Sequence, residues 1–378
     1  MKQIGLYIHL PFCIQKCLYC DFPSWAGRED LRTPYLNALF SELDSYRTEQ
    51  ENLQVNTIFL GGGTPTLFDG EILVQILEKC KEIFHVKEEA EKTIECNPGT
   101  TDRGELEILA RGGFNRLSIG LQAWQDHHLK NLGRLHNCRQ FQETVDWAKQ
   151  AGFLNISADV IFGLPGQTWK EWRETLEKTA AAGITHLSAY SLKIEEGTVF
   201  HQWQQQGKLQ EMEEEQERSL YHRGTALLRE LGFYQYEISN FARPGWESRH
   251  NLNYWRNGEY IGCGSSAHSF FKSIRRGNVS DIEQYIQRMK SGQSVIDFWE
   301  EIDTHTEVFE TLMLGFRLNE GIDKKAFQYR FGFSLNERYG ETIEKLKSQG
   351  LLMEDAQALR PTSLGLDFQN RIAMAFIN

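Results

Sequence analysis

The stretch Tyr7-Ile-His-Leu-Pro-Phe-Cys13-Ile-Gln-Lys-Cys17-Leu-Tyr-Cys20 places three cysteines close together, directly after a short apolar run. Thiolates are the usual ligands of iron–sulfur clusters. A cubane has four irons, so three cysteines leave one iron without a protein ligand, and an open metal position is where a small molecule can bind. The spacing of Cys13, Cys17 and Cys20 therefore predicts a [4Fe-4S] cluster with one open iron.

A zinc ribbon, a redox-active pair and a disulfide framework fit these cysteines less well. A zinc ribbon needs a second C-x2-C pair, but the remaining cysteines are scattered singly at Cys80, Cys96, Cys138 and Cys263. A thioredoxin-like C-x-x-C would use Cys17 and Cys20 and leave Cys13 without a role. A disulfide framework is not expected in a long chain with seven cysteines and no secretion signal.

Length and composition are typical of an enzyme-sized globular protein. The chain has 378 residues, of which 40% are hydrophobic and 25% charged, and this length predicts two to three domains. The net charge of −11 argues against a nucleic-acid partner, because phosphate binding needs clustered Lys and Arg. No apolar run of transmembrane length and no signal-like N-terminus is present. We therefore expect a cytoplasmic protein, whose thiols stay reduced.

The first half of the chain alternates predicted strands and helices. Short apolar or β-branched runs predict six buried strands, at Ile4–Leu10, Val55–Leu60, Thr93–Cys96, Arg116–Leu121, Ile156–Phe162 and Ile184–Ser191. Helices are expected between them, the first capped by Thr33 with Pro34 in its first turn, and the others at Gly70–Phe84, Asp102–Arg111, Arg139–Gln150 and Thr168–Ala182. Six such units in series predict a parallel sheet with right-handed crossovers, which is an incomplete α/β barrel.

Polar residues follow the predicted strands at their carboxyl ends, where such barrels carry their chemistry. The cysteine motif follows the first strand and Gly61-Gly-Gly-Thr-Pro-Thr66 follows the second. Glu95, Gln122 and Asp159 lie at or near the ends of the third, fourth and fifth. Glycines let a backbone approach a ligand closely, and the glycine run is not a Walker motif because no Gly-Lys-Ser/Thr follows it. These positions predict one shared binding site.

Together these segments resemble the radical S-adenosylmethionine (SAM) superfamily, in which the methionyl part of SAM chelates the open iron and the cluster's electron cleaves SAM. Glu95-Cys-Asn-Pro98, Arg116–Gln122, Leu132-Gly-Arg134 and Asp159–Gln167 match, segment by segment, the oxygen-independent coproporphyrinogen oxidase group of that superfamily. The resemblance implies a partial parallel (β/α)6 radical SAM barrel. It also implies one or two SAM molecules near a set of cofactor-binding residues, namely Tyr7, Tyr19, Gly62, Gly63, Thr64, Glu95, Gln122, Arg134 and Asp159.

Two differences from the oxidase resemble a sister branch, the HemW-type haem chaperones. The oxidase has a fourth nearby cysteine where this chain has Phe22, and it has a longer segment ahead of the cluster. His250-Asn-Leu-Asn-Tyr-Trp255 matches the H-N-x-x-Y-W motif associated with haem in that branch. Imidazole is a common haem-iron ligand, and Tyr and Trp offer flat apolar faces to a porphyrin. We expect His250 as a haem ligand from a segment with little helical period, with His268 and Cys263 in reserve. A histidine hydrogen-bonded in a loop is the alternative.

The rest of the second half predicts a helix over Gln210–Leu231 and a strand over Tyr234–Phe241. Further on, a capping box at Ser334-Leu-Asn-Glu337 opens a helix to Ser348. A hairpin of Leu351–Asp355 with Ala358–Pro361 and a final helix at about Ser363–Phe376 complete a small helical domain that resembles a winged-helix module. We expect three domains: a barrel at 1–205, an extension with the haem motif at 206–300, and the winged-helix-like domain at 301–378.

Two functions of different class remain. The first is a haem chaperone that binds haem, a [4Fe-4S] cluster and SAM, and delivers haem to an acceptor haemoprotein, for which the membrane surface is one location. The second is an oxygen-independent coproporphyrinogen III oxidase, which decarboxylates its substrate by radical chemistry. Phe22 and the short segment before Cys13 favour the chaperone, whereas the intact SAM-type residues keep open both the oxidase and a protein that binds SAM without turnover. Whether the chain is an enzyme, which acceptor it serves and how it oligomerises stay open.

Overall fold

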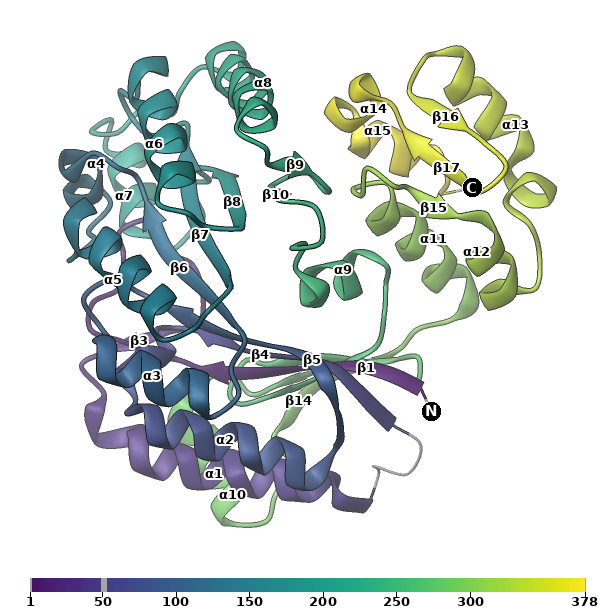
Figure 1. Cartoon of the computed structure of the whole chain (residues 1–378). Helices are drawn as coiled ribbons and strands as arrows, with labels where there is room; N and C mark the ends of the chain where they lie inside the picture. The colour runs from purple at the N-terminus through teal and green to yellow at the C-terminus, as the bar shows by residue number, and fades with distance from the viewer. Residues whose placement is uncertain (1, 49–52, 378) are drawn as a thin grey trace.

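The computed structural model describes residues 2–48 and 53–377 and is built on one large curved sheet (Figure 1). Six parallel strands lie side by side in chain order at its centre: β1 (Lys2–Leu10), β4 (Leu53–Gly62), β5 (His85–Cys96), β6 (Arg116–Gln122), β7 (Asn155–Phe162) and β8 (His186–Ser191). All six predicted strands are confirmed, although β5 begins well before the expected Thr93. β6 is buried along its whole length, as an apolar central strand of a parallel sheet should be.

The expected helices connect these strands and pack their apolar faces on the sheet (Figure 1). They are α1 (Arg32–Ser45), α2 (Gly70–Ile83), α3 (Arg103–Arg111), α5 (Cys138–Gln150) and α6 (Trp169–Ala181). One predicted cap is wrong. The short 3-10 turn η1 (Glu29–Leu31) leads directly into α1, so the helix begins at Arg32 with Leu31 as its N-cap and Thr33 lies inside it. The sequence patterns also missed short elements around these units, namely η2 (Tyr46–Thr48), η3 (Pro65–Leu67), α4 (Asp126–Asn131) and α7 (Val199–Gln205).

The second half of the chain extends both edges of the same sheet. After α8 (Glu214–Glu230), β10 (Asn240–Ala242) pairs antiparallel with β8 and with β9 (Tyr234–Gln235). The chain then crosses to the other edge, where β11 (Tyr260–Cys263) runs parallel to β1. Antiparallel strands and one helix continue from there, namely β12 (His268–Phe271), β13 (Ile274–Asn278), α10 (Ile282–Lys290) and β14 (Ile296–Glu301).

Three expectations for this half need correction. The helix expected from Gln210 begins at Glu214, and the strand expected over Tyr234–Phe241 is interrupted by a turn between β9 and β10. The segment expected to lack helical period forms α9 (Arg249–Trp255), whose first turn is capped by the Ser248 side chain. Hydropathy does not reveal this helix, because the residue that it buries is a histidine rather than an aliphatic side chain.

The C-terminal part has its own hydrophobic cluster, which includes Val308, Leu312, Phe316 and Phe376. Its elements are α11 (Thr304–Gly315), β15 (Ile322–Asp323), α12 (Lys324–Phe331), α13 (Leu335–Ser348), β16 (Leu352–Glu354), β17 (Ala358–Pro361), α14 (Ser363–Asp367) and α15 (Gln369–Met374). The three strands form an antiparallel sheet, and the predicted capping box and hairpin are both present. The final helix is broken at Phe368. None of the described helices is long and apolar enough to cross a membrane.

Candidate cofactor sites

The cysteine loop leaves the carboxyl end of β1 and lines a cavity of about 360 Å³. Two short strands, β2 (Phe12–Cys13) and β3 (Trp25–Ala26), pair in parallel and close the loop at its base. Cys13, Cys17 and Cys20 are free, half-buried thiols that all line this cavity. The loop is tied to the barrel by the Leu18 amide, which donates to the Leu132 carbonyl at 3.1 Å.

Two hydrogen-bond donors point at the cysteine sulfurs. The Thr64 hydroxyl lies 3.8 Å from the Cys13 Sγ, and the Arg134 Nη1 lies 3.4 Å from the Cys17 Sγ. Burial raises the pKa of Cys13, and it raises the pKa of the Cys20 thiol to about 11. A bound metal overcomes this preference because a coordinating thiol is deprotonated, and donors to sulfur are a feature of iron–sulfur sites. The donor set therefore fits a [4Fe-4S] cluster.

The glycine motif at the end of β4 is required by close packing under the cysteine loop. Gly62 has a φ of 109°, and a Cβ there would lie 2.3 Å from the His9 ring. At Gly63 a Cβ would lie 2.5 Å from the Phe12 carbonyl oxygen. The Gly62 amide donates to the Glu95 Oε2 at 3.0 Å. These glycines thus bring the β4 backbone to the cavity wall, as the sequence predicted, and they fix the position of a carboxylate there.

Two half-buried carboxyl groups, Glu95 on β5 and Asp159 on β7, face the cavity from either side of β6. Burial, together with the charge of Asp159, raises the pKa of Glu95 to about 7, and burial also raises the pKa of Asp159. The Ser118 hydroxyl donates to the Asp159 Oδ2 at 3.4 Å. Carboxyl groups held in this way pair with ammonium groups or with hydroxyls of a ligand. They suit the amino and ribose groups of SAM.

Arg134 and Gln122 complete the wall. The Arg134 Nη2 donates to the Asn97 Oδ1 at 2.7 Å and to the Gly120 carbonyl at 2.6 Å, while its buried Nε finds no partner among the residues described. Gln122 has a φ of 72°, an uncommon left-handed backbone for a residue other than glycine. Strained residues of this kind persist where the surrounding structure holds them, often at ligand sites.

The structure brings most of the predicted site residues together. The cavity is lined by the three cysteines with Tyr19, Gly62, Gly63, Thr64, Glu95, Gln122, Arg134 and Asp159. Tyr7 lies elsewhere: its hydroxyl hydrogen-bonds the His9 Nδ1 at 2.8 Å and its ring lines a second cavity. Sequence reasoning missed the contribution of the sixth strand, β8, whose carboxyl end supplies Tyr190, Ser191, Leu192 and Lys193. The strand-end rule applied to the other strands would have found it.

The second cavity is larger, about 680 Å³, and adjoins the cysteine loop. Phe22 lines both cavities. The walls of the second cavity are rich in aromatic rings and also carry one arginine and two histidines, and they include Tyr254, Trp255, Tyr260, Phe270, Arg275, His9 and His268. A volume in the range of about 300–1,000 Å³ with apolar walls and a few polar groups is typical of a site for an organic ligand or cofactor.

His250 does not line this cavity. Its Nδ1 lies 2.8 Å from the Thr57 hydroxyl and its Nε2 lies 2.9 Å from the Tyr254 hydroxyl, while its ring stacks on Phe59 with centroids 5.2 Å apart. Burial, and secondarily the charge of Arg116, lowers the pKa of His250 to about 3. The imidazole is therefore neutral, fully buried and engaged at both nitrogens, so it resembles the hydrogen-bonded alternative more than an open metal ligand.

The two reserve ligands differ sharply. Cys263 is completely buried, and burial raises the pKa of its thiol well above the usual range, so a thiolate is unfavourable there. His268 is exposed on the wall of the second cavity, and within the described part of the chain neither of its ring nitrogens is hydrogen-bonded or ion-paired. His9 also lines the cavity, but its Nε2 lies 2.9 Å from the Pro23 carbonyl and its Nδ1 is bonded to Tyr7.

Comparison with known families matches two parts of the chain. Residues 7–179 match the radical SAM superfamily, and residues 302–368 match the HemN C-terminal domain. The first match covers the parallel strands from β1 to the helix after β7, with the cysteine loop and most of the first cavity. The second covers most of the C-terminal helical unit.

Full-length relatives extend this comparison. The chain is 34% identical to the heme chaperone HemW of Bacillus subtilis over 98% of each chain, and 31% identical to that of Escherichia coli over 100% of this chain and 99% of the relative. It is 31% identical to the mitochondrial radical S-adenosyl methionine domain-containing protein 1 of Danio rerio, over 96% of this chain and 84% of the relative. Among solved structures, coproporphyrinogen III oxidase (HemN) of Escherichia coli superposes with a TM-score of 0.86 at 22% identity, over 100% of this chain and 90% of the oxidase chain. The fold is therefore the same as that of HemN.

Proposed function

The chain belongs to the radical SAM superfamily and, within it, to the family of the heme chaperone HemW, and on this premise we propose that it binds haem and transfers it to an acceptor haemoprotein. The observation that carries the proposal is the second cavity next to the cysteine loop, which combines aromatic walls with the exposed imidazole of His268, a ring without a hydrogen-bond partner among the described residues. Reduced thiols suit a cytoplasmic protein, and an acceptor at the membrane surface is compatible with that location.

In the first cavity we propose that Cys13, Cys17 and Cys20 hold a [4Fe-4S] cluster and that SAM occupies the remaining space. The cluster supplies an electron and an open iron that can chelate SAM. Glu95 and Asp159 would hold the amino and ribose groups, and the free Nε of Arg134 is a donor for the SAM carboxylate. Gly62 and Gly63 keep the β4 backbone close to the ligand because no side chain fits there.

In the second cavity we propose that Tyr254 and Trp255 would pack against haem and that His268 would supply an imidazole ligand to its iron. Aromatic faces pack on a porphyrin, and a neutral imidazole is a common iron ligand. His250 then acts as a positioning residue, because its hydrogen bond orients the Tyr254 ring at the cavity wall. This assignment places haem against α9 and β12, next to the residue that both cavities share, Phe22.

Haem titration of the anaerobic, cluster-loaded chain tests this proposal. Wild type should bind haem saturably with a shifted Soret band, and His268→Ala should weaken binding or change the axial-ligand spectrum. His85→Ala, at a residue outside both cavities, is the matched control and should behave like wild type. Absence of saturable haem binding by wild type would overturn the chaperone function. If His268→Ala has the same haem spectrum and the same affinity as wild type, His268 is not the iron ligand and another residue must supply it.

The second candidate function is coproporphyrinogen oxidation, which the HemN-like fold and the SAM-type residues favour. Phe22, 65% exposed between the two cavities, stands where the oxidase resemblance has a cysteine. We therefore expect no conversion when the cluster-loaded chain is incubated anaerobically with coproporphyrinogen, SAM and reductant. Steady, SAM-dependent formation of protoporphyrinogen would contradict the proposed chaperone function and assign oxidase activity to the chain. Slow SAM cleavage alone would not, because an open iron can reduce SAM unproductively.

We also propose that the chain divides into three domains at about residues 205 and 300. The separate hydrophobic cluster of the C-terminal unit supports the second boundary. The first boundary is less sharp, since β9, β10 and β11 extend the same sheet as the barrel strands.

A further inference from the structure

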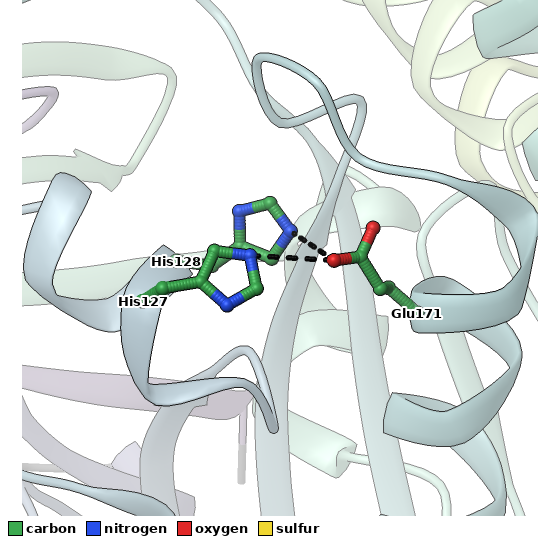
Figure 2. Close-up of side chains that lie close together, drawn as sticks. All are labelled: His127, His128 and Glu171. Carbon is green, nitrogen blue, oxygen red and sulfur yellow. Dashed lines mark ion pairs between the residues drawn. The ribbon is translucent and has the colours of Figure 1, made fainter.

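Two histidines and a glutamate lie close together outside both cofactor cavities (Figure 2). His127 and His128 are neighbours on α4, and Glu171 lies in the first turn of α6. One carboxylate oxygen, the Glu171 Oε1, lies 3.3 Å from the His127 Nε2 and 3.6 Å from the His128 Nε2. Figure 2 shows both imidazoles turned toward this oxygen.

The buried member of the group lacks a hydrogen-bond partner. The His128 side chain is only 4% exposed, and its Nε2 is one of the buried polar atoms left unbonded in the described residues. A buried imidazole nitrogen without a partner carries a desolvation cost, which a bound cation would remove.

The carboxylate is held in place by its other oxygen. The Glu171 Oε2 accepts hydrogen bonds from the Thr168 amide at 2.8 Å and from the Thr168 hydroxyl at 2.7 Å, as part of the capping box of α6. This arrangement orients Oε1 toward the imidazoles and satisfies the oxygen that would not bind a metal. Such outer contacts orient ligands in established metal sites.

We propose that His127, His128 and Glu171 bind a divalent transition metal, with Zn²⁺ as the first choice. Two imidazoles and one carboxylate with an open position form a common zinc ligand set. Tetrahedral ligands at about 2.0–2.1 Å from zinc lie about 3.3 Å from one another, which matches the two nitrogen–oxygen distances of 3.3 and 3.6 Å. The three ligand atoms all lie within 4.8 Å of one another, and His127, 59% exposed, leaves a route for the ion from solvent.

An ion pair without metal accounts for these contacts less well. Protonation of both imidazoles would place two positive charges on rings whose centroids are 4.1 Å apart, and like charges at that distance repel. A neutral imidazole with its proton on Nε2 could donate to the carboxylate, but the His128 Nε2 lies 3.6 Å from the Glu171 Oε1 and makes no hydrogen bond. A single cation between the three atoms satisfies both nitrogens and the carboxylate together.

The position of the site gives it a structural consequence. Asn131 ends α4, and the next residues reach the cysteine loop through the Leu132 carbonyl, which accepts from the Leu18 amide, and through Arg134, which donates to the Cys17 Sγ. A metal that joins α4 to α6 would therefore brace the segment that closes one side of the first cavity. This inference does not depend on haem binding or on transfer to an acceptor.

The test is a Zn²⁺ titration of the full chain by isothermal titration calorimetry, carried out anaerobically after cluster loading, so that the three cysteines are not available to zinc. Wild type should bind one Zn²⁺ per chain. His127→Ala removes an exposed ligand, and Glu171→Gln keeps an oxygen for the capping box while removing the charge. Each substitution should lower the Zn²⁺ affinity by about 100-fold or more. Loss of a residue that only hydrogen-bonds a metal ligand already lowers affinity by about 10- to 100-fold.

The matched control is His222→Ala. His222 is also an exposed histidine beside one carboxylate, with its Nε2 3.3 Å from the Asp367 Oδ2, but it has no second imidazole among the described residues. This variant should bind Zn²⁺ like wild type. The proposal is overturned if cluster-loaded wild type shows no saturable Zn²⁺ binding, or if His127→Ala and Glu171→Gln bind with wild-type affinity and stoichiometry. A rise in the melting temperature on Zn²⁺ addition should be seen in wild type and His222→Ala and be lost in the other two.

Discussion

His250→Ala separates a structural role of this histidine from a role as haem ligand. The substitution removes the imidazole that is hydrogen-bonded to the hydroxyls of Thr57 and Tyr254. Thr57 is only 2% exposed, so water cannot replace this partner. A buried hydroxyl left without its hydrogen bond costs about 1–3 kcal/mol. Loss of the ring that stacks on Phe59 adds a cavity. We expect a total destabilisation of about 2–5 kcal/mol, a large share of the roughly 5–15 kcal/mol typical of a folded protein.

The assay compares wild type, His250→Ala and His268→Ala in two measurements on cluster-loaded chains. Urea midpoints should fall clearly in His250→Ala and stay near wild type in His268→Ala. Haem spectra should show the opposite order, with the axial-ligand signature changed by His268→Ala and retained by His250→Ala. Thr57→Val should reproduce part of the stability loss without a spectral change, since it removes one of the two hydrogen bonds. A His250→Ala chain of normal stability with an altered haem spectrum would refute this reasoning.

The first cavity supplies three further predictions. Replacing Cys13, Cys17 and Cys20 with Ala should abolish the reconstituted cluster of about four irons, whereas Ala at Cys80, Cys96 or Cys138 should leave the iron content unchanged. Gly62→Ala should lower iron retention, because the new Cβ would collide with the His9 ring and a φ of 109° is strained for alanine. Gly245→Ala is the control for backbone strain alone. Its φ is also positive, but its Cβ would meet nothing within 4 Å. The folded protein without SAM raises the pKa of Glu95 from 4.5 to about 7 and therefore favours the neutral acid. The free energy of unfolding should decline by about 3 kcal/mol as pH rises from about 4.5 to about 7, because the carboxyl must then ionise in the fold. The urea midpoint of Glu95→Gln should not show this decline.

The barrel could be predicted from sequence because its strands carry a simple signal. The strands contain short apolar runs of the kind that parallel sheets bury, and Leu117, Ile119 and Leu121 of β6 are all completely buried. The site followed from the fold, since the carboxyl ends of adjacent strands meet at one edge. Hydropathy puts the start of β5 too late, at Thr93, because the first part of that strand is polar and partly exposed.

The second half could not be predicted in the same way. α9 buries His250 where an amphipathic helix would bury an aliphatic residue, so its 3.6-residue period is not visible in hydropathy. The interval of four residues between His250 and Tyr254 puts both on one face of the helix, and their hydrogen bond depends on that helix. His250 contacts Thr57 and Phe59, which both belong to β4. These partners lie nearly two hundred residues away in the sequence, and no local pattern reveals them.

The two cavities are joined by the chain that follows the last cysteine. Phe22 lines both cavities, and Pro23 lines the second. The Pro23 carbonyl is hydrogen-bonded to the His9 Nε2, and the His9 Nδ1 is hydrogen-bonded to the Tyr7 hydroxyl. The segment that follows Cys20 is therefore tied to β1 through His9 and contributes Phe22 and Pro23 to the wall of the second cavity. Because Phe22 is shared, a displacement of this residue would alter the walls of both cavities at once.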